Sequence, residues 1–213
     1  MPQQSFQYSR EYKGHEMKRE KNLRPTPTEW AHWNPGLDNG NLTLGEVYST
    51  LPTYEFHSYP WIVLLLENPK SPFALKGNCT LLRHDLIHVL IGRGLFVQDE
   101  AFVIGYTMGT SRHIGGFEKE FFKWCAHRLY PSKYRFKKSD LSVFDLGFSA
   151  GQSNRIDIFN LPLEQMQHRK LDELRSELNI NVPLLRHLYT IENIITPTRA
   201  SKRIPSYYQM AEG

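Results

Sequence analysis

Apolar residues recur every three or four positions along most of this chain, and this spacing places them on one face of an α-helix. The alternation typical of strands is nearly absent, and only residues 134–138 are ambiguous. Because amphipathic and apolar helices bury their apolar faces against one another, we expect an all-α, single-domain helical bundle. The predicted helices cover residues 42–51, 57–68, 76–92, 95–110, 117–130, 139–159, 163–179 and 182–195.

Proline, glycine and capping residues set several of these boundaries. Pro131 ends helix 117–130, and a turn with two glycines at residues 92–94 separates the two helices before it. Ser139 and Asp140 are typical N-terminal caps for the helix that follows. That helix also carries small residues, which favour close helix packing but would also suit a tunnel for a chain-like ligand. They are Gly147, Ser149, Ala150 and Gly151.

The composition divides the chain into three parts. Residues 1–40 are polar and interrupted by proline and glycine, so we expect an irregular N-terminal arm that Trp30 and Trp33 anchor on the body. Residues 41–197 form the helical domain, and residues 198–213 a loose basic tail.

The strongest chemical signal is the sequence HDLIH at residues 84–88, which Glu100 follows after eleven intervening residues. Residues four apart share one face of a helix, so the imidazoles of His84 and His88 lie together. Asp85 precedes the second histidine by three positions and leans toward the same side. Imidazoles and carboxylates are ligands that divalent first-row metals accept. The pattern therefore indicates a metal site.

Glu100 reaches this face only if helices 76–92 and 95–110 form an antiparallel pair. At 1.5 Å per residue, His88 lies about 6 Å before the turn and Glu100 about 8 Å after it. All four side chains then converge on one ion. Asp99 is a competing carboxylate, but it points about 100° away from its neighbour on a helix, so only one of the two is a ligand.

A less specific interpretation stays open. A histidine and an aspartate in one helix can form a salt-bridged core pair, and two histidines four apart are common by chance. The additional carboxylate of Asp85 and the spacing to Glu100 favour the metal site.

The predicted donor set is two imidazoles and two carboxylates, which suits Zn, Mn, Fe, Co or Mg, with zinc and magnesium first. Four protein ligands leave a fifth or sixth position for water or substrate. A metal in such a site acts as a Lewis acid on a carboxylate or phosphate.

The composition describes an ordinary globular protein of 213 residues, 40% hydrophobic and 23% charged. A net charge of +4 suits an anionic lipid surface or a phosphate or carboxylate substrate. Nucleic acid is not indicated, because no recognised motif or basic stripe occurs. The sequence also lacks nucleotide-binding loops, a serine hydrolase elbow and a CxxC pair.

Cysteine use and hydropathy bear on the compartment. Cys79 and Cys125 are too few for a disulfide framework, so we expect free thiols in a reducing compartment. The longest apolar run, residues 61–66, is too short to span a bilayer. The first residues resemble neither a signal peptide nor a transit peptide. We expect a cytoplasmic protein that could dock on the inner face of a membrane.

The pattern HDxxH-x11-E, here residues 84–88 and Glu100, resembles the motif of a coenzyme Q (ubiquinone) biosynthesis family, often described as the scaffold of the Q-synthesis complex. The specific likeness covers about residues 80–110, including the glycine turn and the continuation VQDEAFVIGYT. A looser helical likeness runs from about residue 42 to residue 195. One departure is Ile87, where many members carry tryptophan.

The resemblance implies an all-helical peripheral membrane protein that binds a prenylated lipid or quinone precursor in an apolar cavity. It implies other quinone-synthesis proteins as partners, and a homodimer is left open. The family is linked to removal of the ring carboxylate of a prenylated hydroxybenzoate, with hydroxylation at the same carbon. By this likeness, helices 57–68, 95–110 and 139–159 would surround the prenyl tail. The implied metal ligands are His84, Asp85, His88 and Glu100.

An anionic headgroup would need cations near the metal. The candidates are Arg83, Arg93 and Arg112, together with Lys119. Charge at a helix C-terminus, turned to solvent, is the alternative role for the first two.

Two further functions stay open on the sequence alone. One is a non-catalytic lipid-binding or organising protein in which the metal only fixes a headgroup. The other is a helical metallophosphohydrolase of the histidine-aspartate type, which needs a further histidine and aspartate from other helices. The candidates for those are His57 or His113 with Asp140 or Asp145.

Overall fold

The computed structural model describes residues 32–52, 81–130, 132, 135–154 and 156–203. Within these ranges the chain is helical and contains no strand; one isolated bridge joins Thr43 and Lys170. The expected all-α fold is confirmed. The α-helices are α2 (Leu44–Ser49), α4 (Leu81–Ile91), α5 (Val97–Thr110), α6 (Gly116–Arg128), α7 (Lys138–Ser153), α8 (Leu171–Glu177) and α9 (Val182–Ile195). Short 3-10 helices are η3 (Ile158–Asn160), η4 (Leu163–Gln165) and η5 (Ser201–Arg203).

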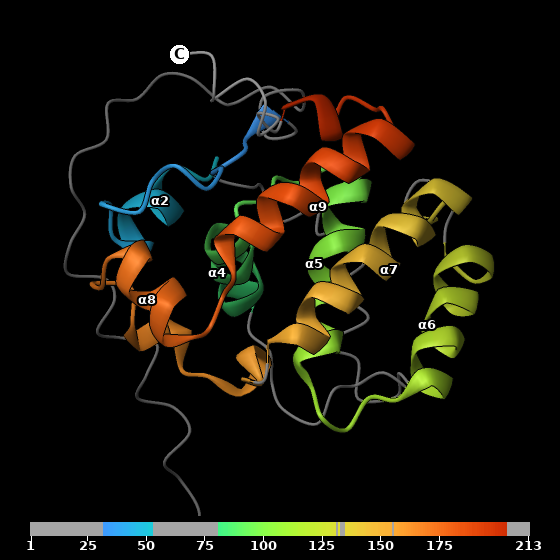
Figure 1. Ribbon diagram of the computed structural model, residues 1–213, viewed down its shortest axis with the longest axis horizontal. Helices are drawn as coiled ribbons and strands as arrows, with labels where there is room; N and C mark the ends of the chain where they lie inside the picture. Colours follow the sequence, from blue (N-terminus) through green and yellow to red (C-terminus); the bar gives the residue numbers. More distant parts are fainter. Residues whose placement is uncertain (1–31, 53–80, 131, 133–134, 155, 204–213) are drawn as a thin grey trace, which may run out of the picture.

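Helices α4 and α5 occupy the middle of the molecule, and α7 and α9 cross in front of them (Figure 1). Helices α2 and α8 lie on the left of this view, and α6 forms the right-hand edge. The larger apolar core joins α4 and α5 to α8 and α9, and it includes Leu86, Phe102 and Tyr189. A smaller core, half of whose buried residues are phenylalanines such as Phe122 and Phe144, lies between α5, α6 and α7. The most buried helices are therefore the two that carry the predicted metal ligands.

Helices α5 and α7 approach each other so closely that glycine is required at the contact. A Cβ atom on Gly105 would lie 2.2 Å from the Phe144 carbonyl oxygen, and one on Gly147 would lie 2.3 Å from that of Phe102. Gly151 faces α5 in the same way. The small residues of this helix thus serve close packing, and this contact leaves no space for a prenyl tail. Away from this contact, the expectation that these helices surround a prenyl tail stays a prediction.

Replacing Gly105 with alanine is expected to destabilise the protein by about 1–3 kcal/mol, the usual cost of overpacking, because the new methyl group meets backbone of α7 rather than a movable side chain. Gly116→Ala is the matched control, since nothing lies within 4 Å of a Cβ atom there. Chemical denaturation of both variants measures the difference. Equal stability of the two would contradict the packing account.

Several predicted boundaries are wrong in detail. Helix α7 is capped by Asp140, which accepts a hydrogen bond of 2.7 Å from the backbone of Lys137, while Ser139 lies inside the helix. It ends at Ser153, well short of residue 159. The helix predicted for residues 163–179 is divided into η4 and α8.

Other predictions concern residues outside the described ranges. These are helix 57–68, the start of helix 76–92, Trp30, Cys79 and Tyr134. The rest of the ambiguous stretch 134–138 forms no strand, because residues 135–137 are irregular and Lys138 begins α7. Cys125 is a buried free thiol, as expected.

Both ends of the described chain pack on the domain. Trp33 packs against the larger core and donates a hydrogen bond of 3.0 Å from Nε1 to Thr50 Oγ1, as expected for an anchor of the arm. Beyond residue 197, Ala200 and Ser201 are buried. The prediction of a loose tail is therefore wrong for residues 198–203, because small residues there fit against the domain.

None of the described helices is both long and apolar enough to cross a membrane.

Candidate metal centre

Helix α4 presents two imidazoles from successive turns. Its apolar residues Leu86, Ile87 and Val89 are fully buried, which fixes the rotation of the helix. His84 and His88 then lie on one face with ring centroids 4.6 Å apart and ring planes at 75°. Their Nε2 atoms are 2.9 Å apart.

The turn after α4 brings a carboxylate to the same point. Gly92 has a φ of 72°, the left-handed conformation with which glycine commonly ends a helix, and the backbone of Arg93 donates to the carbonyl of His88 at 2.9 Å. Glu100 lies in the first turn of α5. Its Oε2 atom is 3.0 Å from Nε2 of His84 and 3.4 Å from Nε2 of His88. The sequence-based expectation that Glu100 reaches both imidazoles is confirmed.

One ring is held in a defined orientation by the backbone. Nδ1 of His88 lies 2.8 Å from the carbonyl oxygen of Gly94. Because a carbonyl only accepts, Nδ1 carries the proton and donates, and Nε2 of the neutral ring presents its lone pair to His84 and Glu100. Histidines that bind metals are typically oriented in this way by a hydrogen bond from the other ring nitrogen.

The charges of the three side chains favour the ionised form of Glu100 and a positive charge beside it. Burial opposes ionisation of Glu100, yet His88 and His84 together hold the pKa of this carboxyl well below its usual range. Burial also opposes protonation of His88, but the charge of Glu100 outweighs it and raises the pKa of the imidazole. The group therefore stabilises a positive charge, which one proton or a metal ion can supply.

The spacing of the three ligand atoms fits a metal ion. One atom each from His84, His88 and Glu100 can be chosen so that all lie within 4.8 Å of one another, and the Nε2 and Oε2 atoms are only 2.9–3.4 Å apart. Ligand atoms of a tetrahedral zinc site with bonds of about 2.1 Å are about 3.4 Å apart. Three protein ligands leave one position of a tetrahedron open, the arrangement typical of catalytic rather than structural zinc.

The three ligand residues differ in their exposure to solvent. His88 is completely buried, whereas the side chains of His84 and Glu100 retain slight exposure. The open side of the centre is thus expected along the edge formed by these two residues, with His88 at its floor.

Asp85 does not join the three ligand atoms. It is absent from the group that the described residues form, and its side chain is only partly buried. Burial raises the pKa of Asp85 to about 6, and the nearby charge of Glu100 adds to this, while His84 and His88 oppose it. The prediction of four converging ligands is therefore wrong by one, because consecutive residues of a helix point about 100° apart.

Asp85→Asn is expected to retain one bound zinc ion per chain and to lose no more than about 100-fold in affinity, the upper end of the usual range for a residue that acts on a metal through its ligands. Competition against a chromophoric chelator measures the affinity. A complete loss of zinc would restore Asp85 as a ligand and contradict the three-residue centre.

The neighbouring carboxylate, Asp99, faces a different set of partners. It caps α5 by accepting a hydrogen bond of 2.9 Å from the backbone of Phe96, and it pairs with Arg93 at 3.3 Å and with Arg203. The expectation that only one of two adjacent acids faces the histidines is confirmed, with Glu100 in that place.

Arg93 cannot receive an anionic headgroup in this structure. Its guanidinium is completely buried and binds both oxygens of Glu192, at 2.7 and 3.0 Å. It also stacks between the rings of Phe102 and Tyr189. Its predicted role at a substrate is therefore corrected to one within the core, where the turn of residues 92–94 buries it.

The other predicted cations are also engaged or distant. Arg83 forms a two-point ion pair with Glu164, with its Nε 3.0 Å from the carboxylate. Lys119 pairs with Asp145 at 2.8 Å. Arg112 is exposed beyond the far end of α5, and about 15 Å of helix rise separates Glu100 from the last residue of that helix.

The residues required for a histidine-aspartate phosphohydrolase do not gather at this centre. His113 is exposed beyond the far end of α5, and Asp140 caps α7. Asp145 is held by Lys119 and Lys123. Within the described ranges, these residues form no second metal group and do not join the first. His57 lies outside those ranges.

Sequence reasoning missed the carbonyl of Gly94 and the partner of Arg93. The first is a backbone atom, which no residue type reveals. The second, Glu192, lies 99 positions away on α9, so no local spacing could have linked the two.

Comparisons with protein-family models, with curated proteins and with solved structures find no match.

Proposed function

We propose that this protein binds one divalent cation through His84, His88 and Glu100 and uses its open coordination position to hold a substrate oxygen. The orientation of His88 supports this proposal best. With Nδ1 bound to Gly94, its Nε2 lone pair points at a second imidazole nitrogen and a carboxylate oxygen, and such a cluster needs a positive charge at its centre.

Zinc is the proposed ion. Two imidazoles and one carboxylate suit zinc, whereas magnesium prefers oxygen ligands and several retained waters. Two histidines with one carboxylate also suit Fe(II), which would leave more positions open. A metal ion in this position supplies a Lewis acid for a carboxylate or phenolate oxygen.

The protein residues prepare the centre for such a ligand. Gly94 holds the ring of His88 in place, and Glu100 provides a negative charge close to both imidazoles. Burial strengthens the electrostatic interactions of these side chains. The slight exposure of His84 and Glu100 leaves the approach for an anionic group on their side.

The resemblance of the HDxxH-x11-E pattern to the coenzyme Q biosynthesis family implies the substrate class, and we propose a prenylated hydroxybenzoate. The reaction is loss of its ring carboxylate: the bond between ring carbon and carboxylate carbon breaks, carbon dioxide leaves, and the ring carbon takes a proton from water. A non-catalytic role, in which the metal only anchors the headgroup, uses the same site residues.

The experiment incubates zinc-loaded and Fe(II)-loaded protein with a carboxyl-labelled prenylated hydroxybenzoate and measures released carbon dioxide and bound lipid. The proposal predicts release that depends on metal and is lost in Glu100→Gln. Binding without release would indicate the non-catalytic role. The absence of both would contradict the substrate class, while the metal centre is tested separately by its metal content.

A further inference from the structure

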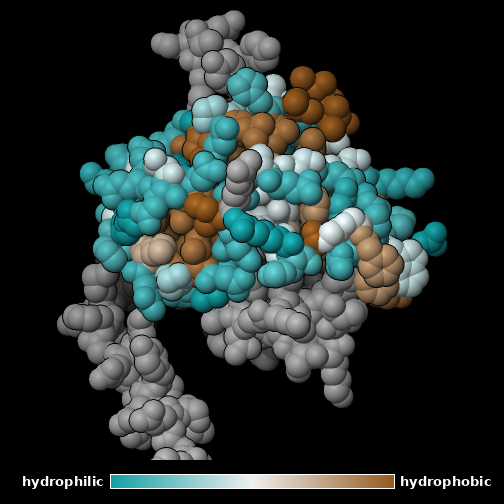
Figure 2. Space-filling view, turned by 60° about the horizontal axis from the view of Figure 1, so that its bottom comes forward, coloured by the Kyte–Doolittle hydropathy of each residue, from teal (hydrophilic) through white to brown (hydrophobic). Residues whose placement is uncertain are grey.

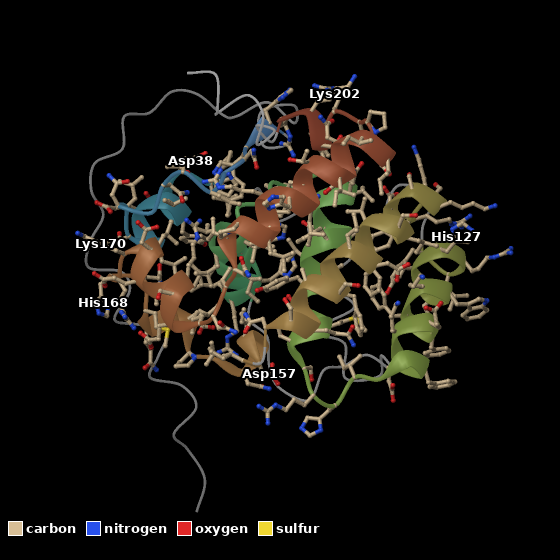
Figure 3. The ribbon with its side chains drawn as sticks, viewed as in Figure 1. Asp38, His127, Asp157, His168, Lys170 and Lys202 are labelled. Carbon is tan, nitrogen blue, oxygen red and sulfur yellow. The ribbon has the colours of Figure 1, made fainter. Side chains whose placement is uncertain are left out.

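Helix α6 (Gly116–Arg128) exposes a row of large aromatic side chains. Phe117 is 79% exposed and Trp124 is 53% exposed, with the partly exposed Phe121 between them. Side chains of this helix project away from the body on the side opposite α7 (Figure 3). Apolar atoms also interrupt the polar surface toward this right-hand edge of the molecule (Figure 2).

The exposed row lies on a different face of α6 from the residues that attach the helix to the domain. Another face of α6 attaches the helix to the domain through the buried residues Phe122, Cys125 and Ala126. The three outer aromatic rings instead stack along the helix, with centroids 6.2 Å apart in each pair. They sit at positions i, i+4 and i+7 and therefore form one continuous stripe. Such a contiguous exposed apolar patch is typical of an interaction site.

The charges beside the stripe are divided between the two ends of the helix. Glu118 and Glu120 lie toward its start, and His127 and Arg128 lie in its last turn. Arg128 continues the stripe four positions after Trp124. Among the described residues, no carboxylate lies within ion-pair distance of it. The two lysines between these ends, Lys119 and Lys123, are held by Asp145 of α7 at 2.8 and 2.7 Å, and they lie farther from Glu120, at 3.7 and 3.5 Å.

We infer that α6 pairs with α6 of a second copy of this chain in antiparallel orientation, forming a symmetric dimer. A twofold axis near the middle of the stripe brings the acidic half of one helix to the basic half of the other. Glu120 then faces His127 and Arg128 of the second copy. The same axis stacks Phe121 on Trp124 and places a guanidinium at the ring of Phe117. Opposite helix dipoles add to this preference for an antiparallel pair.

A second copy fits this stripe better than an anionic membrane does. Two glutamates flank the aromatic row, and the side chain of Glu120 is 64% exposed. Glu118 already accepts a hydrogen bond from the backbone of Gly115, and Glu120 lies near Lys119 and Lys123. A second α6 adds Arg128 as a further cation beside the exposed Glu120, whereas an anionic lipid surface offers this carboxylate no cation. Because the stripe is narrow, we expect a dimer that forms at micromolar concentrations. This inference does not depend on the metal centre.

Sedimentation velocity of the full chain from 1 to 200 µM tests the pairing. The wild-type protein is expected to shift from monomer to dimer across this range, and Trp124→Glu to remain a monomer. Glu120→Arg and Arg128→Glu are each expected to weaken the dimer at least about tenfold. The double variant, with both charges exchanged, should recover to within about threefold of the wild type. Glu173→Arg on the exposed face of α8 is the matched control and should dimerise normally.

Three results would overturn the inference. They are a wild-type protein that stays monomeric at every concentration, a dimer that survives in Trp124→Glu, and a double variant no better than the single ones. Binding of the same variants to phosphatidylserine vesicles tests the alternative partner, a lipid surface. In that case Glu120→Arg would bind the vesicles more tightly than the wild type.

Discussion

His88→Ala protein is expected to contain no stoichiometric zinc after purification, whereas the wild type contains one ion per chain. His88 is the buried ligand whose ring is fixed by Gly94. Its removal leaves only two protein ligands for the metal ion and a space at the bottom of the site. Altering a residue that merely orients a ligand commonly costs about 10–100-fold in metal affinity, so losing a ligand costs more. Elemental analysis by mass spectrometry measures the metal content.

The control for this variant is His113→Ala, which removes an exposed histidine beyond the far end of α5. It should retain the wild-type zinc content, and circular dichroism should show both variants to be helical. Glu100→Gln extends the test, because it keeps the shape of the side chain and removes its charge. Unchanged zinc in His88→Ala and Glu100→Gln would contradict the proposed centre.

Arg93→Ala is expected to destabilise the protein by about 3–5 kcal/mol, the usual cost of removing one partner of a buried ion pair. Both Arg93 and the carboxylates of Glu192 and Asp99 are completely buried. The variant therefore leaves two carboxylates inside the core, with Arg203 as a neighbouring cation for one of them. It also removes the guanidinium between the rings of Phe102 and Tyr189.

Arg169→Ala is the comparison for this prediction, since Arg169 pairs with the largely exposed Glu177 at the surface. Exposed pairs contribute about 0–1 kcal/mol, so this variant should unfold near the wild-type midpoint. Urea denaturation of the two variants measures the difference. An equally small loss of stability in both variants would show that the buried pairs of Arg93 with Glu192 and Asp99 do not attach the α4–α5 turn to α9.

The sequence predicted a helix well where its apolar residues recur with helical spacing and a glycine turn or a proline marks its end. Helices α5 and α6 lie within two residues of their predicted bounds, because a glycine turn or Pro131 ends each pattern clearly. The predicted helix 163–179 carried charges over most of its length. In the structure only Leu171, Leu174 and Arg175 of α8 are buried, and the residues before it form a separate short 3-10 helix.

Only those residues of the candidate site whose positions follow from helix geometry could be predicted from the sequence. Spacing of four residues placed His84 and His88 together, and the turn placed Glu100 opposite them. Spacing also suggested Asp85, but the rotation of α4 that aligns the histidines turns the adjacent residue away. Arg93 illustrates the other limit: its position in a turn suggested solvent, and only α9, distant in sequence, shows that it is buried.

X-ray absorption spectroscopy of the zinc-loaded wild-type protein tests the three-residue centre most directly. We predict a four-coordinate zinc with two imidazole nitrogens, one carboxylate oxygen and one further light-atom ligand, and a spectrum that changes in His84→Ala and Glu100→Gln but not in His113→Ala. A zinc ion with sulfur ligands, a spectrum unaffected by the first two substitutions, or a protein that binds no zinc would contradict the account.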